Sequence, residues 1–387
     1  MPSRPYQPLT EAERIDWLRL IRTEHVGPVT FNRLLKRYGT AAAALAALPQ
    51  LARQGGRNGV RIPSAADAAD EIARLARAGG RLLFSADADY PHLLRAIEDA
   101  PPVLGLIGDG TLLGRAAVAI VGSRNASLNG LRFAEQLARD LGAAGFVVVS
   151  GLARGIDAAA HQGALATGTV AVLAGGADII YPPGNTNLYH AIKGQGAIVA
   201  EMPAGMPPQA RHFPRRNRLI SGLGLGVVVI EANLHSGSLI TARCGLEQGR
   251  EVFAVPGSPL DPRSRGCNDL IRQGAVLTES VDDVLSVLAP AGAAVVPTAS
   301  RAAAVVEPTP SADAPPVASE SSVAAEAAHA RILALLSPVP MPVDELVRRC
   351  GLPAATVHTA LMEWELEGRI DRHPGNRVAL LAPAVGS

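Results

Sequence analysis

Two apolar runs of β-branched residues, each followed at once by a polar tip containing glycine, most strongly limit the folds open to this chain. The first reads AVAIVGSRNAS from Ala117, and the second reads FVVVSGLARGID and ends at Asp157. Such runs are typical of strands buried on both faces of a parallel sheet. In these sheets ligands bind beyond the carboxyl ends of the strands, where glycine admits the ligand and helix N-termini offer free N–H groups. Because both tips carry an arginine, we expect an anionic ligand.

Strand-like runs recur through residues 112–288 and alternate with helical intervals. This alternation predicts right-handed βαβ crossovers and one parallel sheet, so we expect an α/β fold with a Rossmann-like domain at 112–288. The expected strands are 117–122, 146–150, 169–174, 197–201, 226–231 and 251–255, and the expected helices are 128–143, 156–167, 185–194, 213–223 and 238–248.

Residues 1–80 are expected to form a SAM- or helix-hairpin-helix-like helical domain. Thr10 and Glu13 form a capping box ahead of a helical apolar pattern. The segment 25–39 then resembles one half of a helix-hairpin-helix, a module that offers backbone N–H groups to DNA phosphates. A plain helical bundle with a solvated basic face is the alternative. A bridge at 81–111 leads to the sheet.

The end of the chain is expected to hold a linker and a second small domain. Alanine, proline, serine and valine dominate residues 289–325, a composition that cannot bury a core. Residues 326–387 have the order of a winged helix-turn-helix, with Thr356, His358 and Thr359 on the exposed face of its second helix. Because glutamates also line that helix, protein docking and DNA binding are equally open.

Composition narrows the classes of function. The net charge of +1 predicts no general affinity for polyanions, so nucleic-acid binding requires a local patch. The three cysteines form no CxxC pair, and therefore no zinc site or disulfide framework is expected. The N-terminus lacks an apolar signal region and no run of 18 apolar residues occurs, so we expect a soluble, cytoplasmic protein without membrane insertion.

Positive charge is concentrated in RHFPRRNR, residues 211–218. Its arginines cannot all be core groups, because unpaired buried charge is prohibitive. An aromatic ring among arginines suits a single strand, whose bases stack on the ring while guanidinium groups hold phosphates. The alternatives are a solvated helix start with salt bridges and, for Phe213, a hydrophobic staple onto Leu219 or Ile220.

Enzyme functions receive less support. VGSRNAS is not GxGxxG and has no acidic residue at the distance needed for a ribose, and GxxxxGK[ST] is absent, so no NAD or P-loop site is expected. The alternative is a nucleotide phosphoribohydrolase of similar topology, in which Asp157 and His161 would face a pocket. The nearest segment, 235–248, lacks the PGGxGTxxE loop of those enzymes. We therefore expect no catalytic residue, cofactor or metal, with Asp157 as a helix cap.

Seven motifs together resemble the DNA processing protein A (DprA or Smf) family. The resemblance implies a non-catalytic protein that binds single-stranded DNA during natural transformation, forms a homodimer through the Rossmann-like domain and loads RecA. The motifs are GSRNAS (122–127), SGLARGIDAAAH (150–161), AVLAGGADIIYPPGN (171–185), FPRRNRLISGL (213–223), VVIEA (228–232), SGSLITAR (236–243) and FAVPG (253–257).

The resemblance also implies the residues that contact DNA. Backbone N–H groups and the arginine of the first tip would take a phosphate, the second tip would add another, and the 211–218 segment would combine stacking with backbone contacts. Either Arg215 or Arg216 takes the place of a lysine common in the family. Serines that open a helix at 236–238 add a phosphate site or simply cap that helix. The expected residues are Gly122, Ser123, Arg124, Gly151, Arg154, Gly155, Phe213, Arg215, Arg216, Asn217, Arg218, Ser236 and Ser238.

The implied dimer would place two grooves on one strand and thereby raise avidity. Apolar helix faces late in the α/β domain offer an isologous patch, and ordinary core packing is the alternative explanation for them. The residues concerned are Leu270, Ile271, Val284, Leu285 and Leu288.

Overall fold

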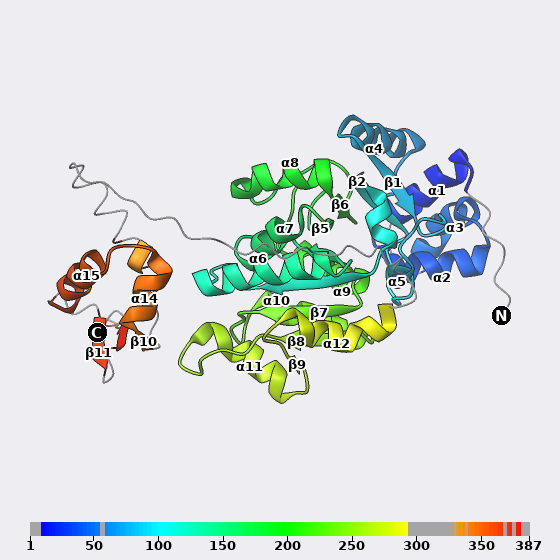
Figure 1. Cartoon of the computed structure of the whole chain (residues 1–387). Helices are drawn as coiled ribbons and strands as arrows, with labels where there is room; N and C mark the ends of the chain where they lie inside the picture. Colours follow the sequence, from blue (N-terminus) through cyan, green and yellow to red (C-terminus); the bar gives the residue numbers. More distant parts are fainter. Residues whose placement is uncertain are drawn as a thin grey trace, which may run out of the picture. The chain divides into compact units, whose positions relative to one another are not determined.

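The computed structural model describes residues 9–54, 59–292, 329, 331–333, 335–336, 340–366, 370–373 and 377–380 (Figure 1). The chain divides into two units, Met1–Ala299 and Ser300–Ser387, and each is described by itself. Most of the expected linker, residues 293–325, lies outside the described residues.

A nine-stranded sheet runs through the first unit in the order β1-β2-β6-β5-β4-β3-β7-β8-β9. Strands β3 to β9 pair in parallel, which confirms the predicted Rossmann-like core. The strand order reverses at β3, because the chain adds β4, β5 and β6 on one side before it crosses to β7 on the other. These strands span Ala117–Gly122 (β3), Val147–Ser150 (β4), Thr169–Leu173 (β5), Ala197–Ala200 (β6), Gly226–Ile230 (β7), Glu251–Ala254 (β8) and Val276–Leu277 (β9).

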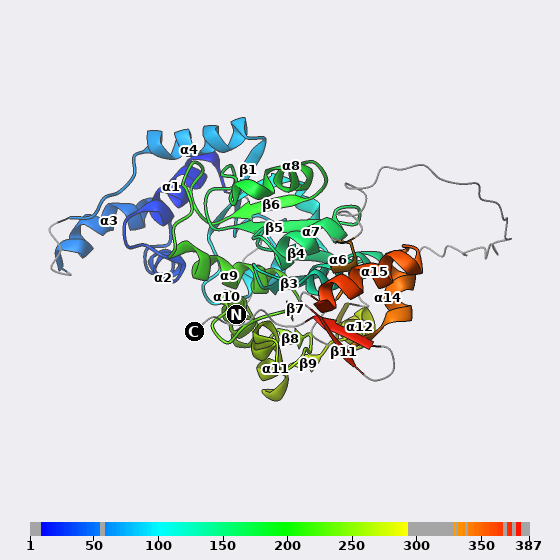
Figure 2. The same cartoon turned by 90° about the vertical axis from the view of Figure 1, so that its left-hand side faces the viewer.

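Helices cover both faces of this sheet, with α6 and α7 on one side and α9 and α10 on the other (Figure 2). Successive side chains of a strand point to opposite faces, so β3 sends Val118 and Ile120 into the α6–α7 layer and Ala119 and Val121 into the α9–α10 layer. The helices span Leu128–Ala143 (α6), Ile156–Ala164 (α7), Thr186–Gln195 (α8), His212–Leu223 (α9), Gly237–Glu247 (α10), Arg265–Arg272 (α11) and Val281–Gly292 (α12).

The segment expected as a bridge, 81–111, extends the sheet. It forms β1 (Gly80–Phe84), the short helix α5 (His92–Arg95) and β2 (Val103–Gly108). Strand β2 pairs antiparallel with β6, and β1 pairs antiparallel with β2. These apolar segments are buried, and buried backbone N–H and C=O groups need partners, which the free edge of β6 supplies.

Among the described residues, four helices precede the sheet, as predicted for the N-terminal region. They are α1 (Glu11–Arg22), α2 (Pro28–Tyr38), α3 (Ala41–Gln54) and α4 (Ala65–Arg77). The capping box at the start of α1 is present: the Glu13 carboxylate accepts from the Thr10 N–H at 2.9 Å, and Thr10 Oγ1 accepts from the Glu13 N–H. Leu18 and Phe31 share one apolar cluster with Phe84 of β1, so these helices and the sheet edge have a common core.

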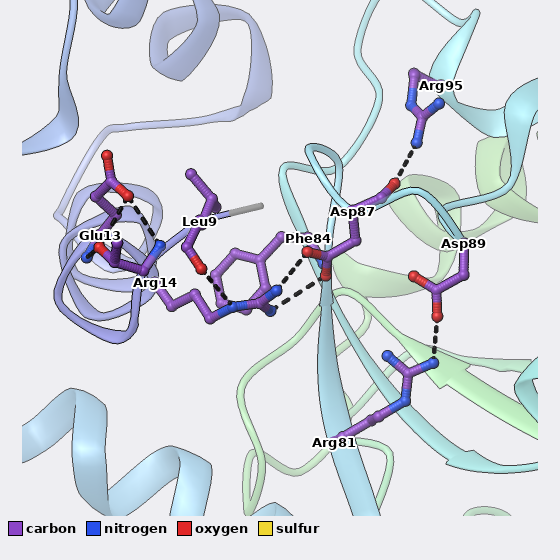
Figure 3. Close-up of polar contacts among 9 residues, drawn as sticks. Leu9, Glu13, Arg14, Arg81, Phe84, Asp87, Asp89 and Arg95 are labelled. Atoms are coloured by element: carbon purple, nitrogen blue, oxygen red, sulfur yellow. Dashed lines mark hydrogen bonds and ion pairs between the residues drawn. The ribbon is translucent and has the colours of Figure 1, made fainter. Parts of the chain in front are cut away.

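Arg14 joins α1 to the turn after β1 (Figure 3). Its guanidinium donates to both carboxylate oxygens of Asp87, at 2.5 and 3.2 Å, and lies over the Phe84 ring at 4.7 Å. Arg95 donates to the Asp87 carbonyl at 2.6 Å from the other side of the turn. The helical region is therefore held by polar contacts as well as by the common core.

The second unit has the predicted winged-helix architecture. Helices α14 (Val343–Cys350) and α15 (Ala354–Leu366) meet at Gly351, which has a left-handed φ of 61°. A sheet in the order β10-β12-β11 combines β10, which precedes the helix pair, with β11 and β12, which follow it. Leu346, Trp364 and Val378 belong to the apolar core of this unit. Of the expected exposed face, Thr359 is exposed and Thr356 is half-buried, whereas the side chain of His358 lies outside the described residues. The strands span Met341–Pro342 (β10), Ile370–His373 (β11) and Arg377–Leu380 (β12).

Candidate nucleic-acid interface

Segments far apart in the sequence meet beyond the carboxyl ends of β3, β4, β5 and β7. They line two adjoining cavities of about 630 and 370 Å³, which we call the larger and the smaller cavity and together the groove. Arg124, Phe213 and Arg216 line both cavities. Three expected residues, Gly155, Arg215 and Arg218, lie outside the lining of the groove. The other expected residues line one cavity each: the larger cavity is lined by Gly122, Ser123, Asn217, Ser236 and Ser238, and the smaller cavity by Gly151 and Arg154.

The first tip, which follows β3 and contains Ser123, Arg124 and Asn125, offers a ligand a guanidinium group, while two of its backbone N–H groups are already bonded. The Ser123 N–H donates to the Ile230 carbonyl at 3.3 Å, and the Asn125 N–H donates to the Ser123 hydroxyl oxygen. Gly122 packs so closely that a Cβ would lie 1.9 Å from the same Ile230 carbonyl oxygen. Arg124 remains exposed at the end of this tip. Because the N–H groups of Ser123 and Asn125 already have acceptors, the Arg124 side chain is the main cationic group that the tip offers.

The N-terminus of α6 next to this tip is occupied by a carboxylate of the protein itself. Ser127 donates to Glu231 from its backbone N–H at 2.8 Å and from its hydroxyl group. Glu231 has a left-handed φ of 52°, and a Cβ on Gly130 would come within 2.9 Å of the carboxylate atoms. In dinucleotide-binding folds the pyrophosphate sits at such a helix start. Here Glu231 already supplies the anion at that place.

The second tip is held by a buried acid. The Asp157 carboxylate accepts from the N–H groups of Gly151 at 3.2 Å and Ala153 at 3.3 Å. The predicted cap is therefore corrected: Asp157 lies inside α7 and caps the tip, while Gly155, with φ 77°, is the N-cap residue of α7. Gly155 also packs on the Ser123 carbonyl, which explains its place outside the groove. Arg154 is exposed at the mouth of the smaller cavity.

Arg216 forms the floor that the two cavities share. It is 6% exposed, and its Nη1 donates to the Val172 carbonyl at 3.2 Å. Burial lowers the pKa of Arg216 to about 10, an effect that the negative charge of Asp157 opposes. Burial in turn raises the pKa of Asp157, and the positive charge of Arg216 opposes that shift. The guanidinium and the carboxylate thus compensate each other beneath the groove.

Asp157 and His161 do not form an open acid–base pair. His161 is fully buried, and burial lowers its pKa to about 3, so the ring is neutral near pH 7. Its Nδ1 lies 2.7 Å from the Thr169 hydroxyl, which itself donates to the Val148 carbonyl. Nδ1 is therefore the protonated nitrogen and donates to Thr169. Packing under β4 and β5 separates this histidine from any ligand in the groove.

The arginine-rich segment 211–218 forms the start of α9, and the turn of the helix divides its side chains. Arg215 is exposed, whereas Arg218 is buried and paired with Glu201 at 2.6 Å and with Asp99 at 3.1 Å. Asn217 is also buried and donates to the Gly237 carbonyl at 3.2 Å, which fixes the first turn of α10. Arg218 thus has an internal partner on each side. Arg215 lies 3.8 Å from the Glu201 carboxylate but keeps about half of its side chain exposed, so it can still reach a ligand.

Phe213 is half-buried between the two cavities. Its ring centroid lies 5.8 Å from that of Tyr181, and the guanidinium of Arg124 lies 5.4 Å from the ring centroid. Sequence reasoning missed Tyr181, although a tyrosine in the Gly- and Pro-rich stretch after β5 was the available signal. The cap function expected for the serines of α10 is confirmed, because Ser236 Oγ accepts from the Ser238 N–H.

Within the residues described by the structure, no cluster of three or more His, Cys, Asp or Glu side chains could hold a metal ion. The same part of the chain contains no helix with the length and apolarity needed to span a membrane.

Comparison with protein families assigns each region of the chain. The family described as DNA recombination-mediator protein A matches residues 81–289. The DprA-like N-terminal HHH domain matches residues 11–73, and the DprA winged helix domain matches residues 308–376.

Individual relatives agree with this assignment. The chain is 41% identical over 304 residues to the protein Smf of Escherichia coli (strain K12), covering 77% of each. It is 46% identical over 199 residues to the DNA processing protein DprA of Streptococcus pneumoniae (strain ATCC BAA-255 / R6), covering 51% of this chain and 70% of the relative.

Two solved structures share the fold. The X-ray structure of DNA processing protein A from Streptococcus pneumoniae aligns with a TM-score of 0.56 at 36% identity, over 68% of this chain and 98% of that chain. The DNA processing protein A of Helicobacter pylori, described for its single-stranded DNA binding mode, aligns with a TM-score of 0.51 at 29% identity. That alignment covers 55% of this chain and 96% of the other.

Proposed function

The chain belongs to the DNA recombination-mediator protein A family, and we propose on that premise that its groove binds single-stranded DNA. One observation carries the proposal: exposed Arg124 and Arg154 flank a half-buried aromatic ring, Phe213, at the carboxyl edge of a parallel sheet. Guanidinium groups bind phosphates, and an aromatic ring among them stacks on a base. The Helicobacter pylori relative, described for its single-stranded DNA binding, supports the same ligand.

The position of the ring favours a single strand over a duplex. Phe213 lines both cavities and is partly covered, so only an unpaired base can be placed against it. Paired bases are stacked on one another and expose no face to such a site. Arg215, exposed just beyond Phe213 on α9, extends the cationic surface along the path of the backbone. We expect weak sequence preference, because phosphates and stacking carry little base information.

A comparison of single-stranded and duplex oligonucleotides of equal length tests this proposal. Fluorescence anisotropy across a salt series should show tighter binding of the single strand and an affinity that falls as salt rises. Phe213→Ala should weaken single-strand binding by about 1–3 kcal/mol without changing the salt slope. A preference for duplex, or an affinity insensitive to salt, would reject the groove as the binding site.

The bound strand is proposed to receive RecA during DNA uptake, and the protein is proposed to act in the cytoplasm. This step rests on the family membership together with the proposed binding of a single strand in the groove. RecA filament formation on a strand precoated with a single-strand-binding protein should accelerate when this chain is added. An Arg124→Ala variant should accelerate it less, and equal rates for both proteins would separate RecA loading from the groove.

A non-enzymatic role is part of the proposal. The nucleotide phosphoribohydrolase alternative required Asp157 and His161 to face a ligand together, and the burial of His161 argues against it. Incubation with nucleoside monophosphates should release no free base. Base release above the background of a His161→Gln variant would restore the enzyme hypothesis.

A homodimer through the α/β domain is also proposed, on a surface different from the expected one. Val284 and Leu288 are buried against the α6–α7 layer and Leu270 is buried against the other layer, so these three residues of the predicted patch are corrected to core. Ile271 and Leu285 are half-buried against the same layers. Leu246, Leu260 and Leu277 are exposed apolar side chains of the same region that lie outside the groove, and Leu260 is 88% exposed. Light scattering should report a dimer that Leu260→Glu weakens, and an unchanged dimer would place the interface elsewhere.

A further inference from the structure

We propose that Tyr181 is a second base-stacking residue, which binds a base of the strand in the smaller cavity while Phe213 binds a base at the junction of the two cavities. The inference rests on the proposed binding of single-stranded DNA, and it adds a contact residue and a path for the strand through the groove. The strand would run from the larger cavity, past Arg124 and Phe213, to Tyr181 and Arg154.

The first argument is exposure at a cationic cavity. Tyr181 is 45% exposed and lines the smaller cavity together with Arg154 and the buried Arg216. Tyrosine combines an apolar ring with a polar tip, so a ring left half open to solvent retains apolar area for a ligand. Every base has a π-face that can use such a ring, and the adjacent arginines would hold the phosphates on either side of that base.

The second argument is that the segment carrying Tyr181 is anchored to the tip opposite. The Asn185 side-chain amide donates to the Leu152 carbonyl at 3.0 Å and to the Ala153 carbonyl at 3.2 Å. At the other end of the segment, the Asp178 carboxylate accepts from the Gly205 N–H at 2.8 Å. The segment that carries the ring is therefore held at both ends, and little ordering of its backbone is needed when a base arrives.

The third argument concerns where the base would lie. The Tyr181 and Phe213 centroids are 5.8 Å apart with the rings tilted by 58°, a spacing at which aromatic rings contact each other directly. A base cannot lie between them without separating the pair. The exposed part of the Tyr181 ring faces the smaller cavity. The Phe213 ring is partly covered by the guanidinium of Arg124. Successive bases would therefore use the two rings separately, one on each side of the contact.

The experiment compares two oligonucleotides of equal length, oligo(dT) and the same strand with abasic tetrahydrofuran units. Binding of the full-length chain is measured for Tyr181→Ala, Tyr181→Phe and Phe213→Ala, with Leu128→Ala, at an exposed apolar side chain of α6 outside the groove, as a control. Tyr181→Ala should weaken oligo(dT) binding by about 5- to 150-fold and leave the abasic strand unaffected. Tyr181→Phe should bind oligo(dT) like the wild type, because the ring is retained. Ultraviolet crosslinking to a 5-iododeoxyuridine strand should give an adduct on Tyr181.

The possible outcomes separate this inference from the proposed function. If Phe213→Ala weakens oligo(dT) binding while Tyr181→Ala does not, the groove stands and the role of Tyr181 is wrong. If Tyr181→Ala weakens both strands equally, Tyr181 only supports the loop and the inference is also wrong. If the wild-type chain does not bind single strands, the proposed function itself is wrong.

Discussion

The Arg216 guanidinium passes directly under Gly151, so closely that a Cβ on that glycine would lie 1.4 Å from Arg216 Nη1. The contact joins α9 to the tip after β4 and places a buried positive charge beneath both cavities. Asp157 of α7 caps the same tip and accepts from the Gly151 N–H. The packing of α9 against the tip after β4 therefore requires glycine at position 151, because any side chain there would displace Arg216.

Gly151→Ala should displace Arg216 and weaken both the fold and the groove. The guanidinium is the end of a flexible side chain, but it is enclosed and hydrogen-bonded, so movement disturbs its neighbours. We expect a loss of about 1–3 kcal/mol in the free energy of unfolding, as for overpacked cores, together with reduced affinity for single strands. Urea denaturation and anisotropy measure the two effects. Gly114→Ala is the control, because a Cβ there meets nothing within 4 Å; equal stability of the two variants would contradict the prediction.

The salt dependence of binding should report three phosphate contacts. Arg124, Arg154 and Arg215 are exposed, with Arg215 in a long 3.8 Å contact with Glu201, whereas Arg218 is buried between two closer partners. At roughly −0.7 per contact on a single strand, log K should fall with log salt at a slope of about −2. Arg124→Ala should flatten that slope by roughly 0.7. Arg272→Ala, which removes an exposed arginine outside the groove, should leave the slope unchanged, and a slope unaffected by Arg124→Ala would exclude a phosphate contact there.

Arg218→Ala should act on stability and leave the salt slope unchanged. Removing the arginine leaves the buried Glu201 carboxylate without its partner at 2.6 Å. Breaking one side of a buried pair costs about 3–5 kcal/mol, so the urea midpoint should drop well below that of the wild type. Arg139→Ala, at an exposed pair on α6, should change stability by less than about 1 kcal/mol. If Arg218→Ala instead has a flatter salt slope and wild-type stability, Arg218 contacts a phosphate and the prediction is wrong.

Stability should fall on acidification because of His161. Its pKa is about 3 in the folded chain against 6.5 for the ordinary group, so the unfolded chain binds the extra proton first. The contribution of the neutral His161 ring to the free energy of unfolding is fully present above pH 6.5. It is lost as the pH falls towards 3, at up to about 1.4 kcal/mol per pH unit. His161→Gln should therefore lose less stability than the wild type between pH 6 and pH 4. Parallel stability curves for the two proteins would show that His161 is not the titrating group.

Local patterns in the sequence were enough to predict the six parallel strands β3 to β8 and the tips that carry the groove. The runs at 117–122 and 146–150 become β3 and β4, within a residue of their expected bounds, since apolar β-branched residues that end at glycine or at a polar turn define a strand locally. The first-tip and second-tip arginines are exposed as predicted for the same reason: polar residues after a buried strand leave the core. The cap of α10 at Ser236 is likewise a local interaction.

Only the tertiary structure decided how residues within one segment divide between ligand and core. In 211–218 the sequence shows a uniform cluster of arginines, yet Arg215 points outward while Arg216 and Arg218 are buried, because Asp157, Glu201 and Asp99 reach them from other elements. The apolar residues Val284 and Leu288 near the end of the domain are buried because they pack against the α6–α7 layer. Strands β1 and β2 extend the sheet because β2 pairs with the free edge of β6. A charge or an apolar face is buried or exposed according to partners that the fold brings to it, and those partners lie far away in the sequence.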